Sequence, residues 1–382
     1  MIDIKDKSAC CGCSACVQRC PVHCIAMHDD EEFFPYPLAD ASKCINCHLC
    51  EKVCPVIHQG DPRTPLEVLA AKNLNDTYRL SSSSGGLFTS LAEHVIEKGG
   101  VVFGACWNEE WKVKHDYTEN LQGLSNFRSS KYLQSVIGDS FLKAERFLKA
   151  GREVMFTGTP CQIAGLKLFL RRDYKNLLTV DVICHSVPSP GIWQQYLTEK
   201  LQQLKWRIAD IRHISFRNKK KGWKNYSIII KNKDGRTFSE TSSKNPFMRG
   251  FLANLYTRPS CFACPAKELK SGSDITLGDY WGIAITQPEL DDDKGVSAVV
   301  VNTEKGQAYL QAIKGVGMST ASWKDLCKRN PAIIHSTTPN RLKEEFWNKR
   351  NTSIEARIKK LCKRPLNIRG IIWNALRIIH LK

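Results

Sequence analysis

The sequence has no apolar run long enough to cross a bilayer, and no charged-then-apolar segment precedes Cys10. These two absences disfavour an integral membrane protein and a secreted one, so we expect a cytoplasmic protein. Cysteine, by contrast, is plentiful, with 17 residues in a chain of 382. Because thiols stay reduced in the cytoplasm, we expect them to bind metal rather than to form disulfides.

Acidic residues are too few to balance the basic ones, and the formal net charge is +18. A basic protein suggests nucleic acid as a partner, but the sequence lacks a recognition-helix motif and an aromatic RNA-binding signature. Nucleic acid is therefore disfavoured. An acidic ferredoxin, an anionic membrane or a phosphorylated substrate fits the charge at least as well.

Two runs near the N-terminus repeat one four-cysteine spacing, C-x2-C-x2-C-x3-C-P. This spacing is typical of bacterial two-cluster iron–sulfur proteins, in which the fourth cysteine of each run binds the other cluster. It predicts one [4Fe–4S] cluster on Cys10, Cys13, Cys16 and Cys54. It predicts a second on Cys44, Cys47, Cys50 and Cys20, and hence a protein that transfers electrons. Structural zinc is the alternative, but it leaves the third cysteine and the Cys-Pro of each run unexplained.

The length predicts a small cluster-binding domain joined to a larger one. The fold class is α+β, in which a bacterial-type dicluster ferredoxin module, residues 1–60, precedes a larger mixed α/β domain, residues 66–340. Prolines and a glycine mark the linker between them. Apolar patterns predict strands over 68–72, 101–105, 154–157, 177–183, 275–277 and 296–301, and helices over 87–98 and 304–313.

Three further segments, 211–216, 226–231 and 236–241, are expected to form an antiparallel patch. The run Lys219 to Lys221 is interpreted as its solvated turn. Residues 341–382 form a basic tail that carries about half of the net charge of +18. From residue 368 the apolar residues fall at helical spacing, which predicts an amphipathic helix. That helix either contacts a membrane peripherally or packs against protein.

Four cysteines of the larger domain stand where strands end or in a C-x2-C pair: Cys161, Cys184, Cys261 and Cys264. Together they would form a third tetrahedral site for a [4Fe–4S] cluster or for zinc. Cys161 could instead be a reactive thiol near a helix N-terminus. The other five cysteines outside the N-terminal runs are interpreted as small buried hydrophobic residues, namely Cys11, Cys24, Cys106, Cys327 and Cys362.

Residues 81–86, Ser-Ser-Ser-Ser-Gly-Gly, lead into the predicted helix at Leu87. Small residues and free N–H groups at a helix N-terminus favour an anion such as a flavin diphosphate. A helix cap or a mobile loop is the alternative. The segment is not the G-x-G-x-x-G fingerprint of dinucleotide-binding folds.

The segments 81–88, 127–132, 158–167, 181–190, 258–267 and 273–283, in this order, resemble the coenzyme F420 hydrogenase/dehydrogenase β-subunit family. The similarity covers residues 66–305. It implies a flavoprotein that holds FAD beside a [4Fe–4S] cluster bound by Cys161, Cys184, Cys261 and Cys264. It also implies flavin contacts from Ser83, Ser84, Gly85, Gly86, Lys131, Tyr132 and Asp279. The substrate does not follow, because relatives reduce different compounds.

These features together predict an iron–sulfur flavoprotein oxidoreductase that passes electrons between a ferredoxin-like donor and a small organic substrate. Two other classes compete with it. One is a non-catalytic electron-transfer subunit of a larger hydrogenase or dehydrogenase complex, and the other is a zinc-stabilised scaffold or nucleic-acid protein. His185, next to Cys184, is interpreted as a hydrogen-bonded structural histidine, with proton donation as the alternative.

Overall fold

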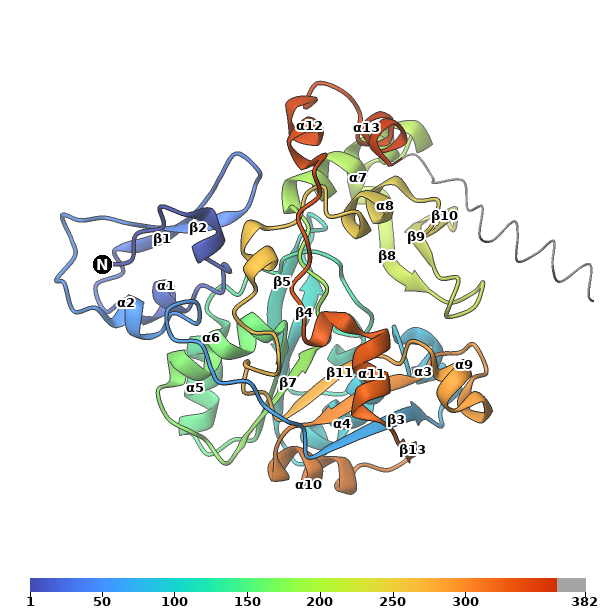
Figure 1. Ribbon diagram of the computed structural model, residues 1–382, viewed down its shortest axis with the longest axis horizontal. Helices are drawn as coiled ribbons and strands as arrows, with labels where there is room; N and C mark the ends of the chain where they lie inside the picture. The colour runs from blue at the N-terminus through green and yellow to red at the C-terminus, as the bar shows by residue number, and fades with distance from the viewer. Residues whose placement is uncertain (363–382) are drawn as a thin grey trace, which may run out of the picture.

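The computed structural model describes residues 1–362 (Figure 1). An N-terminal module lies to one side of a larger body, which contains an eight-stranded and a three-stranded sheet. Among the described residues, no helix has the length and apolarity that a membrane span requires. The amphipathic helix expected from residue 368 lies outside the described residues.

The module contains η1 (Lys7–Ala9), α1 (Ala15–Arg19), α2 (Leu49–Lys52) and an antiparallel hairpin of β1 (Ile25–Asp29) and β2 (Pro35–Ala39). Its two cysteine runs fold alike. After the second cysteine of each run, Ser14 or His48 adopts a left-handed backbone, with φ of 61° and 57°. A short helix follows and carries the third cysteine. The sequence repeat is therefore also a structural repeat.

The large sheet has the strand order β13-β3-β12-β11-β7-β6-β4-β5. In chain order the strands are β3 (Glu67–Asn73), β4 (Val101–Trp107), β5 (Val113–Thr118), β6 (Val154–Gly158), β7 (Leu177–Val182), β11 (Ile275–Asp279), β12 (Ser297–Val301) and β13 (Val316–Thr320). The four central strands β11, β7, β6 and β4 run parallel. Their carboxyl ends consequently meet at one edge of the sheet, where ligands of open α/β sheets usually bind.

Helices cover both faces of this sheet because side chains alternate along each strand. Phe103 and Phe156 pack under α5 (Ser140–Lys149) and α6 (Pro160–Leu170). Their neighbours Val102 and Met155 point to the opposite face, against α4 (Leu87–Glu97). The other helices of this part are α3 (Asp76–Ser81), α9 (Ile283–Thr286), α10 (Glu304–Ala312) and α11 (Trp323–Arg329), with the short turns η2 (Gly123–Asn126), η5 (Pro288–Leu290) and η6 (Pro331–Ile333).

The second sheet consists of β8 (Ile211–Asn218), β9 (Ser227–Asn232) and β10 (Thr237–Thr241), all antiparallel. It packs on α7 (Pro190–Leu204), α8 (Pro246–Leu252), α12 (Lys343–Asn348) and α13 (Ile354–Leu361), and η3 (Ile208–Asp210) leads into β8. The short turn η4 (Pro259–Ala263) instead contacts η1 of the module. Phe346, Trp347, Ile354 and Ile358 are buried in this core. The described part of the basic tail, up to residue 362, thus packs into the body instead of extending from it.

The strands and helices predicted from apolar patterns are confirmed, including the antiparallel patch. One detail was wrong. Lys219 does not lie in a solvated turn, because its side chain is buried with 6% exposure, whereas Lys220 and Lys221 are exposed. The sequence predicts one solvated turn for all three lysines, but the tertiary fold buries Lys219 against the loop that follows α3.

Candidate cofactor sites

The first predicted thiolate set, Cys10, Cys13, Cys16 and Cys54, gathers within the module. Burial, and then the neighbouring Cys10 and Cys54, raise the pKa of the Cys16 thiol to about 12. The set faces the body, because Cys13 packs closely on Gly165 of α6. The residue between Cys10 and Cys13, Cys11, is buried against the same body.

The second predicted set, Cys20, Cys44, Cys47 and Cys50, lines one small pocket of the module. Cys47 is exposed to solvent. Ile45, which corresponds in the repeat to buried Cys11, is 61% exposed and lines the same pocket. The two sets therefore differ in position, since the first lies against the body and the second lies near the surface.

Backbone N–H groups donate to sulfur atoms in both sets. The N–H of Gly12 lies 3.4 Å from Cys10 Sγ, and that of Asn46, its counterpart in the repeat, lies 3.4 Å from Cys44 Sγ. The N–H of Ile2 donates to Cys50 Sγ over 3.3 Å. Hydrogen bonds of this kind stabilise negative charge on sulfur and tune iron–sulfur clusters. The donor sets and their surroundings fit two clusters.

Cys24 is buried, as predicted, and it packs in the small hydrophobic cluster of the module with Ile2 and Ile25. Its Sγ is 3.4 Å from Cys20 Sγ, and it lines the pocket of the second set. Within residues 1–362, no three His, Cys, Asp or Glu side chains are arranged to hold a single metal ion. The four thiolates of a [4Fe–4S] cluster each bind a different iron atom, so a cluster site does not require three ligands around a single metal ion.

The third predicted set lines a cavity of the body, at the carboxyl ends of β6 and β7. Cys161 lies in the first turn of α6, directly after β6, and Cys184 follows β7, the strand paired with β6. Cys261 in η4 and Cys264 complete the lining, which also includes Cys11 of the module. The tertiary fold thus brings together four cysteines from three separate segments of the sequence.

Two buried cations surround this third set. Arg258 is completely buried and Lys267 is 7% exposed, and both line the cavity. Lys267 Nζ donates to the carbonyl oxygen of Cys184 over 2.7 Å. Burial raises the pKa of the Cys261 thiol to about 12, so its ionised form needs positive charge nearby. Four thiols with two cations fit a bound metal cluster.

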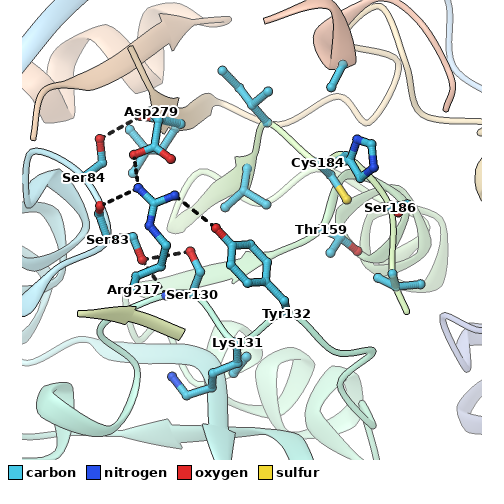
Figure 2. Close-up of a pocket in the computed structure, with 18 of the residues that line it drawn as sticks. Ser83, Ser84, Ser130, Lys131, Tyr132, Thr159, Cys184, Ser186, Arg217 and Asp279 are labelled. Carbon is cyan, nitrogen blue, oxygen red and sulfur yellow. Dashed lines mark hydrogen bonds and ion pairs between the residues drawn. The ribbon is translucent and has the colours of Figure 1, made fainter. Parts of the chain in front are cut away.

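A large cavity of about 750 Å³ opens beside the third set. Its lining includes Ser83, Ser84 and Gly86, which precede α4, together with Lys131, Tyr132 and Asp279. Figure 2 shows Asp279 beside Ser84 and Ser83. Its wall includes Cys184, His185 and Thr159, which also line the cavity of the third set. The two cavities therefore share a wall.

Gly85 alone of the predicted flavin contacts does not line the large cavity. An added Cβ there would lie 2.3 Å from the carbonyl oxygen of Ala71 and 2.6 Å from the backbone nitrogen of Ser297. Gly85 instead lets the serine-rich loop approach β3 and β12. Its role in the structure is to place its neighbours, so the prediction of a direct contact is not supported at this position.

Arg217 is the cavity residue that sequence analysis missed. It is 2% exposed and comes from β8, in the second sheet. Its guanidinium donates to Asp279 Oδ1 over 2.9 Å, to the carbonyl oxygen of Ser83 over 3.0 Å and to the Tyr132 hydroxyl over 3.2 Å. Figure 2 shows it between these three groups. No local motif marks this arginine, because its partners come from three other segments.

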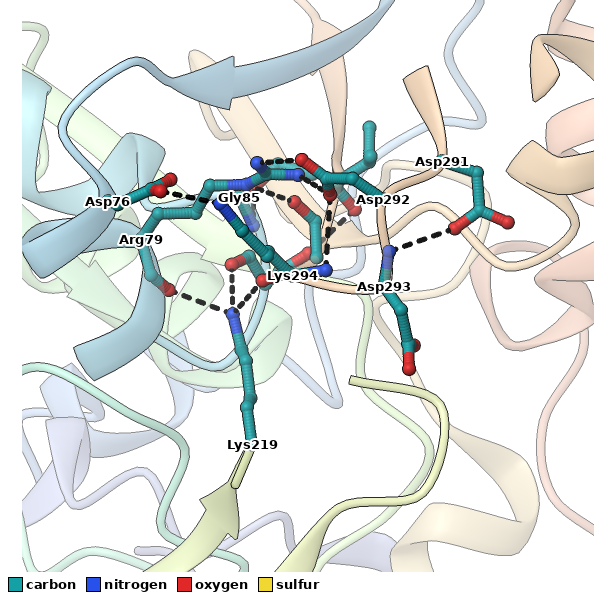
Figure 3. A network of polar contacts seen from close by, with 12 residues as sticks. Asp76, Arg79, Gly85, Lys219, Asp291, Asp292, Asp293 and Lys294 are labelled. Atoms are coloured by element: carbon teal, nitrogen blue, oxygen red, sulfur yellow. Dashed lines mark hydrogen bonds and ion pairs between the residues drawn. The ribbon is translucent and has the colours of Figure 1, made fainter. Parts of the chain in front are cut away.

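A second network fastens the serine-rich loop from behind (Figure 3). Lys219 Nζ donates to the carbonyl oxygens of Arg79 over 2.8 Å, Ser84 over 2.5 Å and Lys294 over 2.7 Å. Arg79 in turn forms a two-pronged ion pair with Asp292, both contacts being 2.5 Å. One buried ammonium group thereby holds two loops together at the edge of the cavity.

His185 Nε2 lies 2.9 Å from Asn254 Oδ1. Burial lowers the pKa of His185, which favours the neutral ring. This geometry agrees with the interpretation of a hydrogen-bonded structural histidine. The remaining cysteines, Cys106, Cys327 and Cys362, lie in or against hydrophobic clusters, away from the three sets.

Two protein-family models match parts of the chain. Residues 9–57 match the 4Fe-4S dicluster domain family, which confirms the prediction of [4Fe–4S] clusters in the module. Residues 151–323 match the family that describes the C terminus of the coenzyme F420 hydrogenase/dehydrogenase beta subunit. No curated protein sequence matches the chain.

Among solved structures, a chain of the F420-reducing [NiFe] hydrogenase complex from Methanosarcina barkeri is similar, with a TM-score of 0.49 and 17% sequence identity. The match covers 77% of this chain and 97% of that chain. This likeness is too loose to assign a function. Residues 9–57 are thus similar to a dicluster [4Fe–4S] domain, and residues 151–323 are similar to the C terminus of the coenzyme F420 hydrogenase/dehydrogenase beta subunit.

Proposed function

We propose that the protein is an iron–sulfur flavoprotein oxidoreductase with three [4Fe–4S] clusters and one FAD. The observation that carries this proposal is the shared wall between the third cysteine set and the large cavity. The two sets of the module would hold one cluster each, as their spacing predicts. When bound, the clusters transfer single electrons, and a flavin exchanges these for the electron pair that an organic substrate requires.

The large cavity suits a flavin in size and in charge. Its volume of about 750 Å³ falls in the range of cofactor pockets. The N-terminus of α4 presents free N–H groups beside Ser83, Ser84 and Gly86, which favours a phosphate group. Lys131 adds positive charge on the lining, where the charge of Arg217 is paired with that of Asp279. We assign these residues, with Tyr132 and Asp279, to flavin binding.

The positions of the three cysteine sets define an order from the surface to the cavity. The second set lies nearest to solvent, the first contacts the body, and the third adjoins the cavity. Val22 and Ile45, which line the pocket of the second set, are 38% and 61% exposed. A redox partner such as ferredoxin would therefore dock near Cys47, and an organic substrate would enter the large cavity.

The proposal is tested by cofactor analysis of anaerobically purified protein. We expect about twelve irons and one flavin per chain, without zinc. The double variant C44S/C47S removes ligands of the second set, and C261S/C264S removes ligands of the third. Each should lower the iron content to about eight. Cys327→Ser is the matched control, because Cys327 lies outside every set, and it should retain about twelve irons.

Different outcomes contradict different parts of the proposal. Zinc in place of iron would contradict the electron-transfer function as a whole. A C261S/C264S variant with unchanged iron content would mean that these cysteines hold no cluster. Iron without any flavin in the wild-type protein would limit the chain to electron relay, which is the role of a non-catalytic subunit.

A further inference from the structure

Arg258 occupies an unusual position at the contact between the module and the body. Its side chain is 0% exposed, and within residues 1–362 its hydrogen-bond partners include no Asp or Glu carboxylate. A buried charge without a counter-charge is costly, so such a cation is retained only where other groups compensate it. The surrounding atoms show what those groups are.

The guanidinium of Arg258 is enclosed by groups of the module. It donates to the carbonyl oxygen of Cys10 over 2.9 Å and to that of Pro35 over 3.0 Å. Its Nη2 lies 3.7 Å from Cys10 Sγ, the first ligand of the first set. The rings of Phe34 and Tyr36 lie 5.4 Å and 4.4 Å from its Cζ and exclude water. The Cys10 thiolate is thus an anionic partner of this cation.

The loop from Cys10 to Cys13 fits tightly around Arg258. At Gly12, where φ is +69°, an added Cβ would lie 3.0 Å from Arg258 Cζ and 2.3 Å from Gln134 Nε2. Gln134 accepts a hydrogen bond from Arg258 over 2.9 Å and donates to the carbonyl oxygens of Cys11 and Gly12. This packing fixes the guanidinium relative to the first set.

On its other side, Arg258 lines the cavity of the third set, together with Cys161 and Cys261. The same cation therefore lies between two of the three cysteine sets. The second set lies at the solvent-facing part of the module, and the cation that lines its pocket, the ammonium group of Met1, is partly exposed and pairs with Glu51. Arg258 is placed to act on the first and third sets and not on the second.

We propose that Arg258 is a positioning residue that raises the reduction potential of the cluster held by Cys10, Cys13, Cys16 and Cys54. Cluster potentials depend on nearby charge and on hydrogen bonds to sulfur, and a cation favours the reduced, more negative state. In a site from which water is excluded this effect is strong. Arg258 would thereby make the first set the preferred electron acceptor of the module, next to the body. This inference rests on the proposed function.

The test is a redox titration, followed by electron paramagnetic resonance, of full-length protein purified anaerobically. The C44S/C47S/C261S/C264S background removes the signals of the second and third sets, so that the remaining signal is that of the first. In this background, Arg258→Met should shift the midpoint potential of the first cluster to a lower value. Arg258→Lys retains the charge but loses the forked contacts, and it should produce a smaller shift in the same direction.

Arg357→Met is the matched control. Arg357 is also buried, at 2% exposure, but it donates to Gln195 Oε1 and packs on Phe346, away from the cysteine sets. It should leave the potential unchanged. An unchanged potential in an iron-loaded Arg258→Met protein, or an equal shift in Arg357→Met, would overturn the inference.

If Arg258→Met fails to retain iron, the inference is tested with Arg258→Lys instead. A wild-type midpoint potential in Arg258→Lys would then overturn the inference. Wild-type protein without iron would instead contradict the proposed function, which the iron analysis shows before any titration. The two failures are therefore distinguishable.

Discussion

Replacing Arg217 with methionine should destabilise the body and release the flavin together. The change removes the donor to Asp279, Ser83 and Tyr132, and it leaves the Asp279 carboxylate without its counter-charge. Breaking a buried ion pair on one side costs about 3–5 kcal/mol. The low end of this range applies here, because the Asp279 side chain is 15% exposed and still accepts a hydrogen bond from Trp223 Nε1 over 2.8 Å.

We therefore expect a loss of about 3 kcal/mol. For a body of about 300 residues, each kcal/mol lowers Tm by about 1.5 °C, so the expected decrease is roughly 4–5 °C. Thermal unfolding at one fixed scan rate and flavin quantification measure the two effects. The double variant R217M/D279N removes the unpaired charge as well, and it should recover part of the stability.

Three results would refute this reasoning. A Tm of Arg217→Met within about 1 °C of the wild type would mean that the ion pair contributes little to stability. A double variant whose loss equals the sum of the two single losses would mean that Arg217 and Asp279 act independently. Retention of the full flavin content by Arg217→Met would remove the residue from the proposed flavin site.

Three other predictions concern the loops at the two cofactor regions. Burial lowers the pKa of Lys131 to about 8, so an anion bound beside its ammonium form should bind roughly tenfold more weakly at pH 9 than at pH 7. FAD titrations should show this pH dependence in the wild type and not in Lys131→Arg, whose side chain stays charged. An equal pH dependence in both proteins would exclude Lys131 as the group that binds the anion. Lys219→Met removes one donor from each of three carbonyl oxygens, and it should lower the FAD affinity while the exposed control Lys220→Met does not. Gly12→Ala should lower Tm and iron content more than Gly99→Ala, because both glycines have a left-handed backbone but only Gly12 has close neighbours. Equal losses in the two variants would show that backbone strain alone causes them.

The sequence identified the parts of this protein whose chemistry depends on local spacing. The repeated C-x2-C-x2-C-x3-C-P runs predicted the dicluster module, which the match of residues 9–57 to a 4Fe-4S domain confirms. Apolar periodicity predicted the strands and helices of the body, because periods of two and 3.6 residues reflect which side chains are buried. Both patterns extend over only a few residues, so they can be recognised in the sequence without knowledge of the tertiary structure.

The tertiary structure decided where the charges lie. Arg217, Lys219 and Arg258 are three of 56 basic residues in a basic chain, and nothing near them in sequence marks them as buried. Each becomes special only through partners from distant segments, since burial makes an ammonium or guanidinium group depend on the few acceptors within reach. The shared wall between the third cysteine set and the large cavity arises in the same way. It forms because neighbouring parallel strands end at one edge of the sheet.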